Sequence, residues 1–494
     1  MNLKIQNQIY VIGAGLAGIS IAKEIRQKGV IGRVVAFLDD DPLKIGRRVN
    51  GIPVLGPLED ITNLINPSGD DEALIAIPSG TQEQILRAYN LLRQAGFART
   101  RIRILPSLSQ ILYGDAHLIQ AREIDPEDLL TRPPVSVSLK ESISYVRHKR
   151  VLVTGAGGSI GSELCRQLLS GGAERLYLFG HGENSIFGID RELRILQEEG
   201  VGEKATIVPV IGELQDRSYM LHILERLQAD VVFHAAAFKH VPMMEANPVA
   251  AIQNNVFGTK NLIEAALKAQ VGRFVMISTD KAVNPYSVYG ASKFLAEQLV
   301  VRERRKGNSY IVVRFGNVLG SRGSILPLFR KQILKGGPLT VTHPEASRFF
   351  MTIPEASSLV LKAGGIEVDG DFLLLDMGEP LVIKELAEQM IRFYDYEPQR
   401  DIKLVYTGLR PGEKLIERLW SENEYPKKTQ FPKILRVSSA YDFGTELDEV
   451  ISDLAKVCFF DAGAPQIYRN RKALKNTIRR VVPNLESDFT EPDY

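Results

Sequence analysis

The sequence predicts an α/β protein with two domains, each built on a doubly wound parallel sheet. Two segments carry this prediction, residues 8–29 and 149–172, because each reads as a short β-branched strand, a glycine-rich turn and an amphipathic helix. Each segment opens a stretch in which strands and helices continue to alternate, as they do in parallel sheets covered by helices on both faces. We therefore predict two Rossmann-like domains, the second with a smaller C-terminal substrate lobe.

The domain boundaries follow from changes along the chain. We expect an N-terminal Rossmann-like, nucleotide-binding-type domain over 1–120 and a linker rich in charge, proline and serine over 121–149. The second glycine loop then opens a core over 150–320. Clean alternation of strands and helices ends there, so we assign 321–440 to the substrate lobe. The remainder, 441–494, is predicted to hold a C-terminal helix and a polar tail.

Composition excludes several classes of protein. The chain has 494 residues, is 44% hydrophobic and 24% charged, and its net charge of +2 argues against a nucleic-acid partner. Its two cysteines, Cys165 and Cys458, make no disulfide framework and fit a reducing cytoplasm. No Cys or His spacing indicates a metal site, and no apolar run is long enough for a transmembrane helix. We therefore expect a cytoplasmic globular protein without a metal.

The second glycine loop, GAGGSIG at 155–161, lies between a predicted strand and a predicted helix. Glycines there let the backbone approach a pyrophosphate, which then meets the free N–H groups at the helix N-terminus. Downstream, the segment HAAA at 234–237 ends a strand with small residues, where a flat adenine or ribose can lie. The predicted cofactor-binding residues outside the catalytic group are Gly155, Gly158, Ser159, Ile160, Gly161, Ala235, Ala236 and Asn255.

The stretch STDKAVNPYSVYGASK, residues 278–293, concentrates ionisable side chains after another predicted strand. Asp280 and Lys281 follow the carboxyl end of that strand, where α/β sheets bind ligands. Tyr289 and Lys293 are four residues apart, so they share one face of a helix, and a nearby ammonium lowers the pKa of a phenol. Each pair alone is more often a solvated surface feature. Downstream of the glycine loop, we predict Tyr289 and Lys293 as catalytic, and the position of Asp280 and Lys281 beside the tyrosine favours a functional role for them as well.

Seven motifs together resemble the extended short-chain dehydrogenase/reductases: GAGGSIGSE, HAAAFKHVPMME, NNVFGT, ISTDKAVNP, YGASK, RFGNVLGSRGS and LRPGEK. More narrowly, they resemble the bacterial UDP-N-acetylglucosamine 4,6-dehydratases of polysaccharide biosynthesis, over residues about 125–435. The N-terminal domain resembles the extra domain of the long members of that group. Long members usually begin with transmembrane helices, which this sequence lacks. We expect either a member without such helices or a piece of a longer chain.

The resemblance implies a reaction in which C4 of UDP-N-acetylglucosamine is oxidised, water is lost across C5 and C6, and hydride returns to C6. Tyr289 would take the proton of the 4-hydroxyl, and Lys293 would also hydrogen-bond the nicotinamide ribose. Lys281 would remove the C5 proton and Asp280 would protonate the departing hydroxyl, with a water relay or an exchange of these two roles as alternatives. We expect crowding by Lys293 and desolvation by the bound substrate to lower the pKa of Lys281.

The resemblance also implies a UDP-sugar site, a nicotinamide cofactor and a homo-oligomer. Many members carry an acid at the end of the second strand to hold the cofactor ribose, but Gly180 stands there, with His181, Glu183 and Asn184 nearby. We expect NAD and leave NADP open. The predicted substrate-binding residues are Lys239, Asn317, Arg348, Arg410 and Glu413, with the two arginines as phosphate clamps.

Two rival functions share part of this pattern. A UDP-sugar 4-epimerase would have the same fold, tyrosine and cofactor, but it needs no base at C5, so Asp280 and Lys281 favour the dehydratase. A non-catalytic nucleotide-sensing protein has no need for all four catalytic residues. Whether C5 is inverted or retained stays open.

Two further segments allow more than one interpretation. Gly13, Gly15 and Gly18 have dinucleotide-loop spacing, and Asp39 ends the next strand, which predicts a second nucleotide site. A purely structural domain is an equal alternative, because no catalytic cluster follows in that domain. The basic stretch at 468–480 usually means a solvated helix face, with peripheral contact to an anionic membrane as the alternative.

Overall fold

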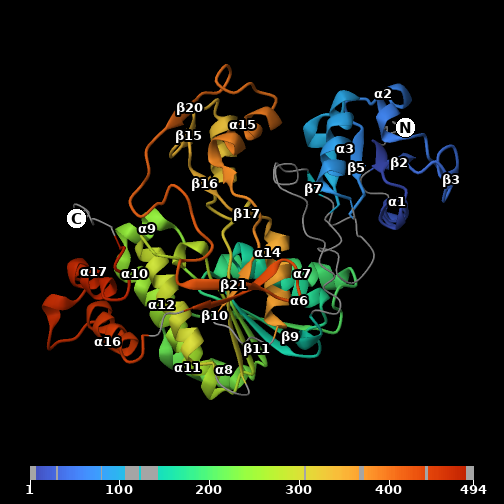
Figure 1. Ribbon diagram of the computed structural model, residues 1–494. Coiled ribbons are helices and arrows are strands. Elements are labelled where there is room, and N and C mark those ends of the chain that lie inside the picture. The colour runs from blue at the N-terminus through green and yellow to red at the C-terminus, as the bar shows by residue number, and fades with distance from the viewer. Residues whose placement is uncertain are drawn as a thin grey trace. The chain divides into compact units, whose positions relative to one another are not determined.

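Figure 1 shows a computed structural model that describes residues 7–28, 32–78, 80–105, 122–123, 143–304, 308–366, 372–439 and 443–485. The chain divides into two compact units. The first comprises Met1–Leu139 with Glu199–Val201, and the second comprises the remaining residues from Lys140 onward. Most of the linker predicted at 121–149 lies outside the described residues, and so does the end of the tail at 486–494.

The first unit is built on a five-stranded sheet with the order β2-β1-β5-β6-β7. The four leading strands run parallel, and β7 pairs antiparallel with β6. The strands are β1 (Gln8–Ile12), β2 (Arg33–Leu38), β5 (Glu72–Ile75), β6 (Ile102–Ile104) and β7 (Arg122–Glu123), with a separate hairpin of β3 (Arg48–Val49) and β4 (Ile52–Pro53). The helices are α1 (Leu16–Lys28), α2 (Ile61–Leu64) and α3 (Gln82–Gln94). Because the strand order reverses at β1, the sheet is doubly wound.

The second unit is built on a nine-stranded sheet with the order β10-β9-β8-β11-β12-β13-β18-β22-β21. The first seven strands run parallel, and β22 pairs antiparallel with both of its neighbours, β18 and β21. Their bounds are β8 (Arg150–Thr154), β9 (Arg175–Gly180), β10 (Thr206–Ile211), β11 (Val231–His234), β12 (Arg273–Ile277), β13 (Ser309–Arg314), β18 (Phe372–Leu375), β21 (Glu424–Lys428) and β22 (Ile434–Ser439). The order reverses between β8 and β11, which is where such sheets bind ligands. These two sheets confirm the predicted fold class.

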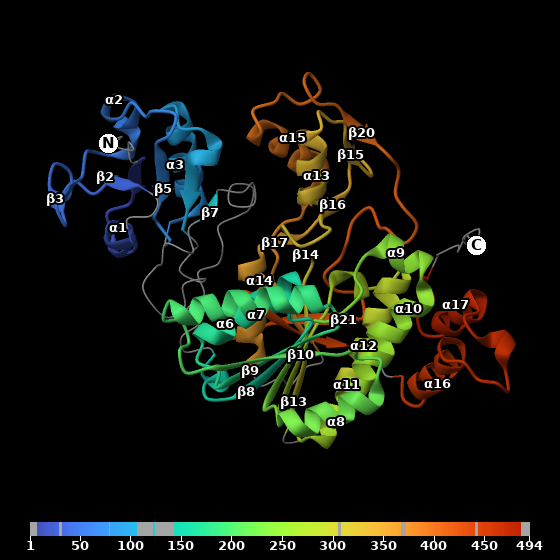
Figure 2. The same cartoon turned by 180° about the vertical axis from the view of Figure 1, so that it is seen from behind.

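Helices cover both faces of this sheet, as Figure 2 shows. One face carries α6 (Ser159–Ser170), α7 (Glu183–Glu198) and α14 (Ile353–Gly364), and the other carries α8 (Arg217–Leu227), α11 (Gly258–Lys268) and α12 (Val288–Arg302). Helix α12 is buried on every side from Val288 to Val300. A helix enclosed in this way has little freedom to move, so the side chains that it presents are held in fixed positions.

A lobe follows the parallel strands. It contains the short pairs β14 (Asn317–Val318) with β17 (Phe350–Met351), β15 (Leu339–Val341) with β20 (Leu404–Tyr406), and β16 (Ser347–Arg348) with β19 (Leu381–Val382), and helices α13 (Ile325–Leu334) and α15 (Ile383–Phe393). Part of the range predicted as a substrate lobe, 321–440, lies outside this lobe. Strands β18, β22 and β21 return to the core sheet because β18, with the sequence FLLL, is fully buried there.

The described C-terminal residues form two helices, α16 (Glu446–Cys458) and α17 (Arg471–Arg479), which pack against each other. Within the basic stretch, Arg480 is bound 2.9 Å from both Asp453 and Glu449 of α16, and Arg471 donates to the carbonyl of Ala246. Contact with a membrane therefore stays a prediction.

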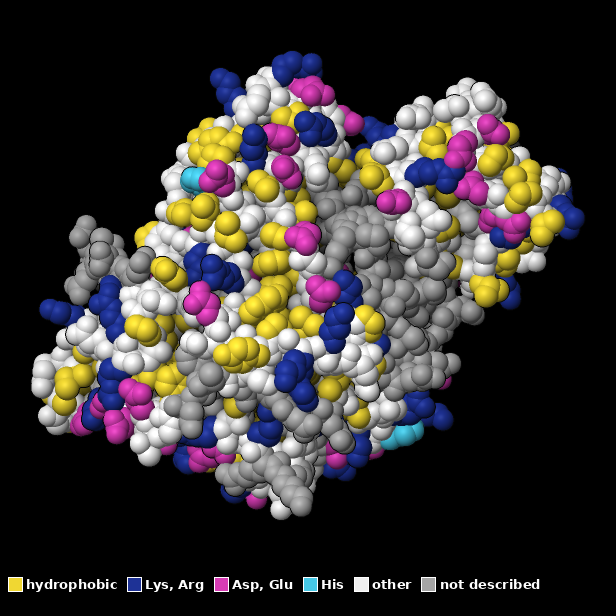
Figure 3. All heavy atoms as spheres, viewed as in Figure 1, with side chains coloured by type: hydrophobic (Ala, Val, Ile, Leu, Met, Phe, Trp, Pro, Cys, Tyr) yellow, Lys and Arg dark blue, Asp and Glu magenta, His cyan; other side chains and the backbone are white. Residues whose placement is uncertain are grey.

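Charge is well mixed on the surface in view. On the face drawn in Figure 3, basic and acidic side chains are interspersed among hydrophobic ones. Among the described residues, no helix has the length and apolar character needed to cross a membrane, and no group of His, Cys, Asp and Glu is arranged to hold a metal ion.

Candidate active site

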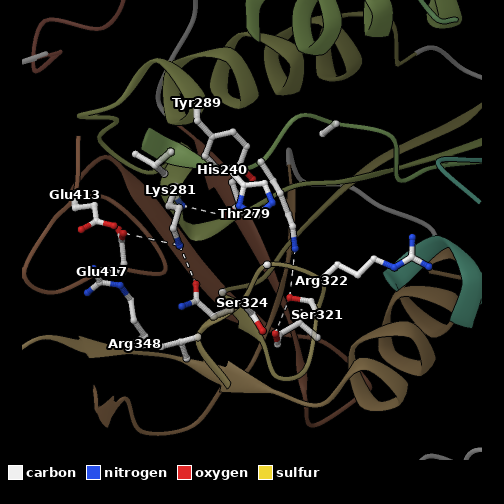
Figure 4. A pocket seen from close by; sticks show the side chains of 18 of the residues that line it. His240, Thr279, Lys281, Tyr289, Ser321, Arg322, Ser324, Arg348, Glu413 and Glu417 are labelled. Carbon is white, nitrogen blue, oxygen red and sulfur yellow. Dashed lines mark hydrogen bonds and ion pairs between the residues drawn. The ribbon is translucent and has the colours of Figure 1, made fainter. Parts of the chain in front are cut away.

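A cavity of about 820 Å³ lies in the second unit, between the carboxyl ends of the parallel strands and the lobe. Its walls come from the start of α6, the segments after β11 and β12, the start of α12, and the lobe. Figure 4 shows the side chains of Lys281, Glu417 and Arg348 converging on it. A cavity of this size is typical of a small-molecule site, and it lies at the point where the strand order reverses.

The glycine loop between β8 and α6 forms one wall. Gly155 has φ +67°, and a Cβ on it would lie 2.8 Å from the Cα of Ala236. A Cβ on Gly161 would collide with the carbonyl of Gly155. Gly158 begins α6 without a side-chain cap, so the first N–H groups of the helix are left for a ligand.

Most of the predicted cofactor-binding residues line this wall. Gly158, Ser159, Ile160, Gly161 and Ala235 do so, whereas Gly155 and Ala236 pack against each other behind it. The loop is also tied to the lobe, because Ser159 Oγ accepts a hydrogen bond of 3.1 Å from the backbone N–H of Arg322.

Asn255 is hydrogen-bonded within the protein, and its role as a cofactor ligand stays a prediction. It lies in a π-helical turn, Gln253–Phe257, and is 1% exposed. Its side chain accepts from the N–H of Phe238 and donates to the carbonyl of Phe238 and to Ser292 Oγ, each at 2.9 Å. Because its amide is bonded within the protein and does not line the cavity, Asn255 holds the loop after β11 in place.

His234, at the end of β11, is a buried neutral anchor. Its Nδ1 lies 2.7 Å from Thr154 Oγ1 and its Nε2 lies 2.9 Å from Thr259 Oγ1. Burial, together with the nearby charge of Lys293, lowers the pKa of His234 to about 3. The imidazole therefore ties β8 and α11 to β11 and carries no charge at neutral pH.

Tyr289 and Lys293 share the cavity-facing side of α12, as their spacing predicts. The helix begins at Ser287, whose Oγ accepts a 3.0 Å hydrogen bond from the N–H of Gly290. Lys293 Nζ donates to the carbonyl of Ile277 at 2.8 Å, and burial lowers the pKa of Lys293 to about 8.

The environment of Tyr289 corrects one expectation. Burial raises the pKa of Tyr289 to about 12, while the ammonium of Lys281 and a hydrogen bond with Thr279 act to lower it. The cation that favours the phenolate is therefore Lys281 and not Lys293, since Lys293 is directed to the carbonyl of Ile277.

Lys281 lies in a 3₁₀ turn, Asp280–Ala282, directly after β12. Its Nζ lies 3.0 Å from Asp280 Oδ1, 2.9 Å from Asn317 Oδ1 and 3.8 Å from Glu417 Oε1. Burial by itself lowers the pKa of Lys281, but the carboxylates of Asp280 and Glu417 outweigh it, so the pKa is raised. The predicted lowering is corrected: two nearby carboxylates stabilise the ammonium.

Asp280 lies behind the cavity wall. It is 0% exposed, and its Oδ1 accepts hydrogen bonds from Thr279 Oγ1 at 2.9 Å and from Lys281 Nζ. Within the part of the chain that the structure describes, its Oδ2 has no hydrogen-bond partner and faces Gly316, where an added Cβ would lie 3.0 Å away. Asp280 does not line the cavity, so this placement favours a role in holding Lys281.

All five predicted substrate-binding residues line the cavity: Lys239, Asn317, Arg348, Arg410 and Glu413. Arg348 donates to the backbone carbonyls of Ser347, Lys414 and Leu415 at 2.7–2.9 Å, so it also braces the lobe. Arg410 is 56% exposed and is paired with Glu413 through its Nε at 3.0 Å.

Glu417 and His240 are among the cavity residues for which no role was predicted. Glu417 is 5% exposed and faces Lys281, while its Oε2 has no hydrogen-bond partner among the described residues. The sequence offers a weak signal, an acid four residues after Glu413 in LRPGEKLIE. His240 packs against Gly323, and burial and the charge of Lys239 lower its pKa.

The glycine loop of the first unit is braced from within. Asp39 Oδ2 accepts from the N–H of Ala14 at 2.7 Å, and its carboxylate is also bound to Lys44. Gly13 has φ +100°, and a Cβ on Gly18 would collide with the carbonyl of Gly13. Because Asp39 is engaged by the loop itself, nucleotide binding at Gly13, Gly15, Gly18 and Asp39 stays a prediction.

The doubly wound sheet, the uncapped glycine loop and the buried Tyr289–Lys293 pair together define an extended short-chain dehydrogenase/reductase. Residues 151–439 match the family described as polysaccharide biosynthesis protein. The chain is 41% identical over 448 residues to the capsular polysaccharide biosynthesis protein CapD of Staphylococcus aureus, over 90% of this chain and 74% of CapD. It is 42% identical over 426 residues to the probable polysaccharide biosynthesis protein EpsC of Bacillus subtilis strain 168, over 86% of this chain and 70% of EpsC.

Among solved structures, the chain is similar to Pen from Bacillus thuringiensis. The TM-score is 0.54 and the identity 32%, over 60% of this chain and 91% of that chain. The chain belongs to the polysaccharide biosynthesis protein family.

Proposed function

We propose that the protein is a nucleotide-sugar 4,6-dehydratase that converts UDP-N-acetylglucosamine to a UDP-4-keto-6-deoxy-N-acetylhexosamine. The observation that carries the proposal is the position of Lys281, an amine at the cavity wall held by Asp280 and Asn317. A base at C5 is what a dehydratase needs and a 4-epimerase does not. The names of CapD and EpsC, both polysaccharide biosynthesis proteins, accord with a sugar-nucleotide substrate.

The glycine loop supports NAD as the cofactor. Its backbone leaves room for a pyrophosphate, and the first N–H groups of α6 have no side-chain cap to compete with it. When bound there, NAD supplies reversible hydride transfer, accepting from C4 and returning to C6. Strand β9 ends at Gly180, so neither a carboxylate nor a guanidinium at that position selects NAD over NADP, and NADP is the alternative.

Each catalytic side chain then has one task. Tyr289 takes the proton of the 4-hydroxyl, and the ammonium of Lys281 and the hydrogen bond with Thr279 stabilise its phenolate. Lys293, fixed by the carbonyl of Ile277, hydrogen-bonds the nicotinamide ribose. A ketone at C4 acidifies the hydrogen at C5, which Lys281 removes.

The diphosphate and sugar occupy the lobe side of the cavity. Arg410 is exposed at the cavity wall and suits a phosphate oxygen, while Glu413 orients it. Lys239 Nζ, 3.3 Å from Ser321 Oγ, faces the same space, and Asn317 and Arg348 complete the proposed substrate contacts. We also propose a homo-oligomer, which light scattering tests directly.

Proton NMR of the protein with NAD and UDP-N-acetylglucosamine in deuterium oxide tests the function. We expect a new C6 methyl signal and deuterium at C5. The same spectra also give the coupling of H1 to H2 and the configuration at C5. A product that differs only at C4 and has no methyl signal would support the epimerase. An unchanged sugar with bound NAD would support a nucleotide sensor.

A further inference from the structure

A strap, residues 407–423, runs from β20 of the lobe to β21 of the core sheet and lines part of the cavity. It carries Arg410 and Glu413, two of the proposed substrate-binding residues. Glu417 of the same strap lies 3.8 Å from the ammonium of Lys281, and Figure 4 shows its side chain directed toward that residue. The strap therefore links the proposed substrate site to the surroundings of the proposed base.

Lys414 of this strap reaches a second segment of the site. Its Nζ donates a 2.8 Å hydrogen bond to the carbonyl of Val283 and lies 5.3 Å from the centre of the Tyr286 ring, where a cation is attracted to the ring face. Both partners belong to the connection at 283–287. That connection joins the 3₁₀ turn that carries Lys281 to helix α12, which carries the proposed catalytic tyrosine. Lys414 thus contacts the segment between two proposed catalytic side chains.

We propose that Lys414 is a positioning residue, which holds the connection at 283–287 in a fixed place relative to the substrate-binding strap. The connection in turn sets the spacing of Lys281 and Tyr289. This inference rests on the dehydratase function proposed above. Lys414 touches neither substrate nor cofactor, and it acts through the carbonyl of Val283.

The strap itself is held by contacts that do not involve the Lys414 side chain. Arg348 donates to the backbone carbonyls of Lys414 and Leu415 at 2.7 Å and 2.9 Å. A Cβ on Gly412 would lie 2.9 Å from the Cβ of Ser287, so the strap also packs closely against the start of α12. Because these contacts use the backbone and a glycine, a change of the Lys414 side chain should release the connection and leave the substrate-binding residues in place.

The proposed reaction depends on this spacing. One bound sugar must present its 4-hydroxyl to Tyr289 and its C5 hydrogen to Lys281, while the strap fixes the position of the diphosphate. A displacement of about 1 Å between a bound substrate and a catalytic group can cost about 10²-fold in rate. The hydrogen bond from Lys414 therefore lets binding of the nucleotide determine where the sugar lies relative to both side chains.

Lys414 also places a positive charge near Lys281. The charged and titratable groups that face the Lys281 ammonium come from its own turn, the segment after β11, helix α12 and the strap: Asp280, Lys239, Tyr289, Lys414 and Glu417. Burial lowers the pKa of Lys414, the two carboxylates oppose this, and the charge of Lys281 lowers it further. Repulsion between two ammonium groups is mutual, so removing the Lys414 charge should raise the pKa of Lys281.

The test is the kinetics of Lys414→Met with UDP-N-acetylglucosamine. Methionine is apolar and flexible enough for the buried position but has neither charge nor donor. We expect kcat to fall by about 10–10²-fold, while KM and the calorimetric affinity for NAD stay within about twofold of wild type. The rising limb of the pH–rate profile should move to higher pH, because Lys281 acts as a base only when it is neutral.

Lys414→Arg keeps a charge and donors at the same position. Its rising limb should therefore stay at the wild-type pH, and part of the lost kcat should return. A variant that lost activity through general damage to the cavity would instead lose affinity for NAD, which the same calorimetric titrations measure.

Arg418→Met is the matched control, since it removes a cation from the same strap at a side chain that is 67% exposed, and it should behave as wild type. An unchanged kcat in Lys414→Met, a lower kcat with an unmoved rising limb, or an equal loss of NAD affinity overturns the proposal. A wild-type enzyme that forms no methyl product from UDP-N-acetylglucosamine overturns the proposed function itself, a result that is seen before any variant is compared.

Discussion

Lys293 Nζ lies 2.8 Å from the backbone carbonyl oxygen of Ile277, and the whole side chain is 3% exposed. Among the described residues, the ammonium donates to one neutral acceptor in a buried environment, and this burial lowers the pKa of Lys293 to about 8. The residue sits on α12, whose enclosure fixes it in place. A ligand hydroxyl that accepts from Lys293 would restore part of the lost solvation.

This burial predicts a pH-dependent cost to the free protein. A lysine whose folded pKa lies below its unfolded value of 10.5 destabilises the fold fully below about pH 8, and the cost disappears as the pH rises to 10.5. The free energy of unfolding of wild type, relative to Lys293→Met, should therefore rise by about 3 kcal/mol between about pH 7 and pH 11. Urea unfolding of both proteins without cofactor measures it, and a flat difference would contradict the pKa.

Asp280→Asn tests whether Asp280 holds Lys281. Removing the carboxylate that lies 3.0 Å from the ammonium should lower the pKa of Lys281, since that charge is one of the two that raise it. The rising limb of the pH–rate profile should move to lower pH, and the maximal rate should fall by about 10–10²-fold because the amine is less well placed. A pH–rate profile that does not move would contradict this role of Asp280. A loss of water elimination with an unmoved profile would instead support the acid role predicted for Asp280.

Gly161→Ala tests the cofactor loop. A Cβ at this position collides with the carbonyl of Gly155, so the turn must open and affinity for NAD should fall at least about tenfold. Gly188→Ala is the control on α7, where an added Cβ meets nothing within 4 Å. That change should leave NAD affinity unaltered and raise stability by up to about 1 kcal/mol. Calorimetric titration and urea unfolding give both quantities, and equal NAD affinity in the two variants would remove the loop from the cofactor site.

Local sequence patterns predicted the fold well, and also the glycine loop and the tyrosine–lysine pair of the site. The strand–glycine–helix segments at 8–29 and 149–172 are short and complete in themselves, so their conformation follows from local chemistry. The same holds for Tyr289 and Lys293, which helical spacing alone places on one face. The lobe was predicted less well because burial of β18 in the core sheet depends on neighbours far away in the sequence.

The role of a residue in the site was harder to predict from the sequence than its position in the fold. Asn255 was expected on the cofactor, yet its amide is occupied by Phe238 and Ser292, partners that no spacing rule connects to it. In the free protein the pKa of Lys281 is raised and not lowered, because the carboxylates of Asp280 and Glu417 lie beside its ammonium. No motif predicted Glu417, since its only relation to Lys281 is spatial.

The sequence by itself determined the two glycine turns, the parallel α/β architecture and the shared helix face of the tyrosine and lysine, because each depends on contacts between residues close along the chain. Only the tertiary structure decided which carboxylate meets the cavity and which is buried behind it. Electrostatic coupling depends on distance and solvent exposure in space, so the 3.8 Å between Lys281 and Glu417 became visible only when the lobe was placed over the strand ends.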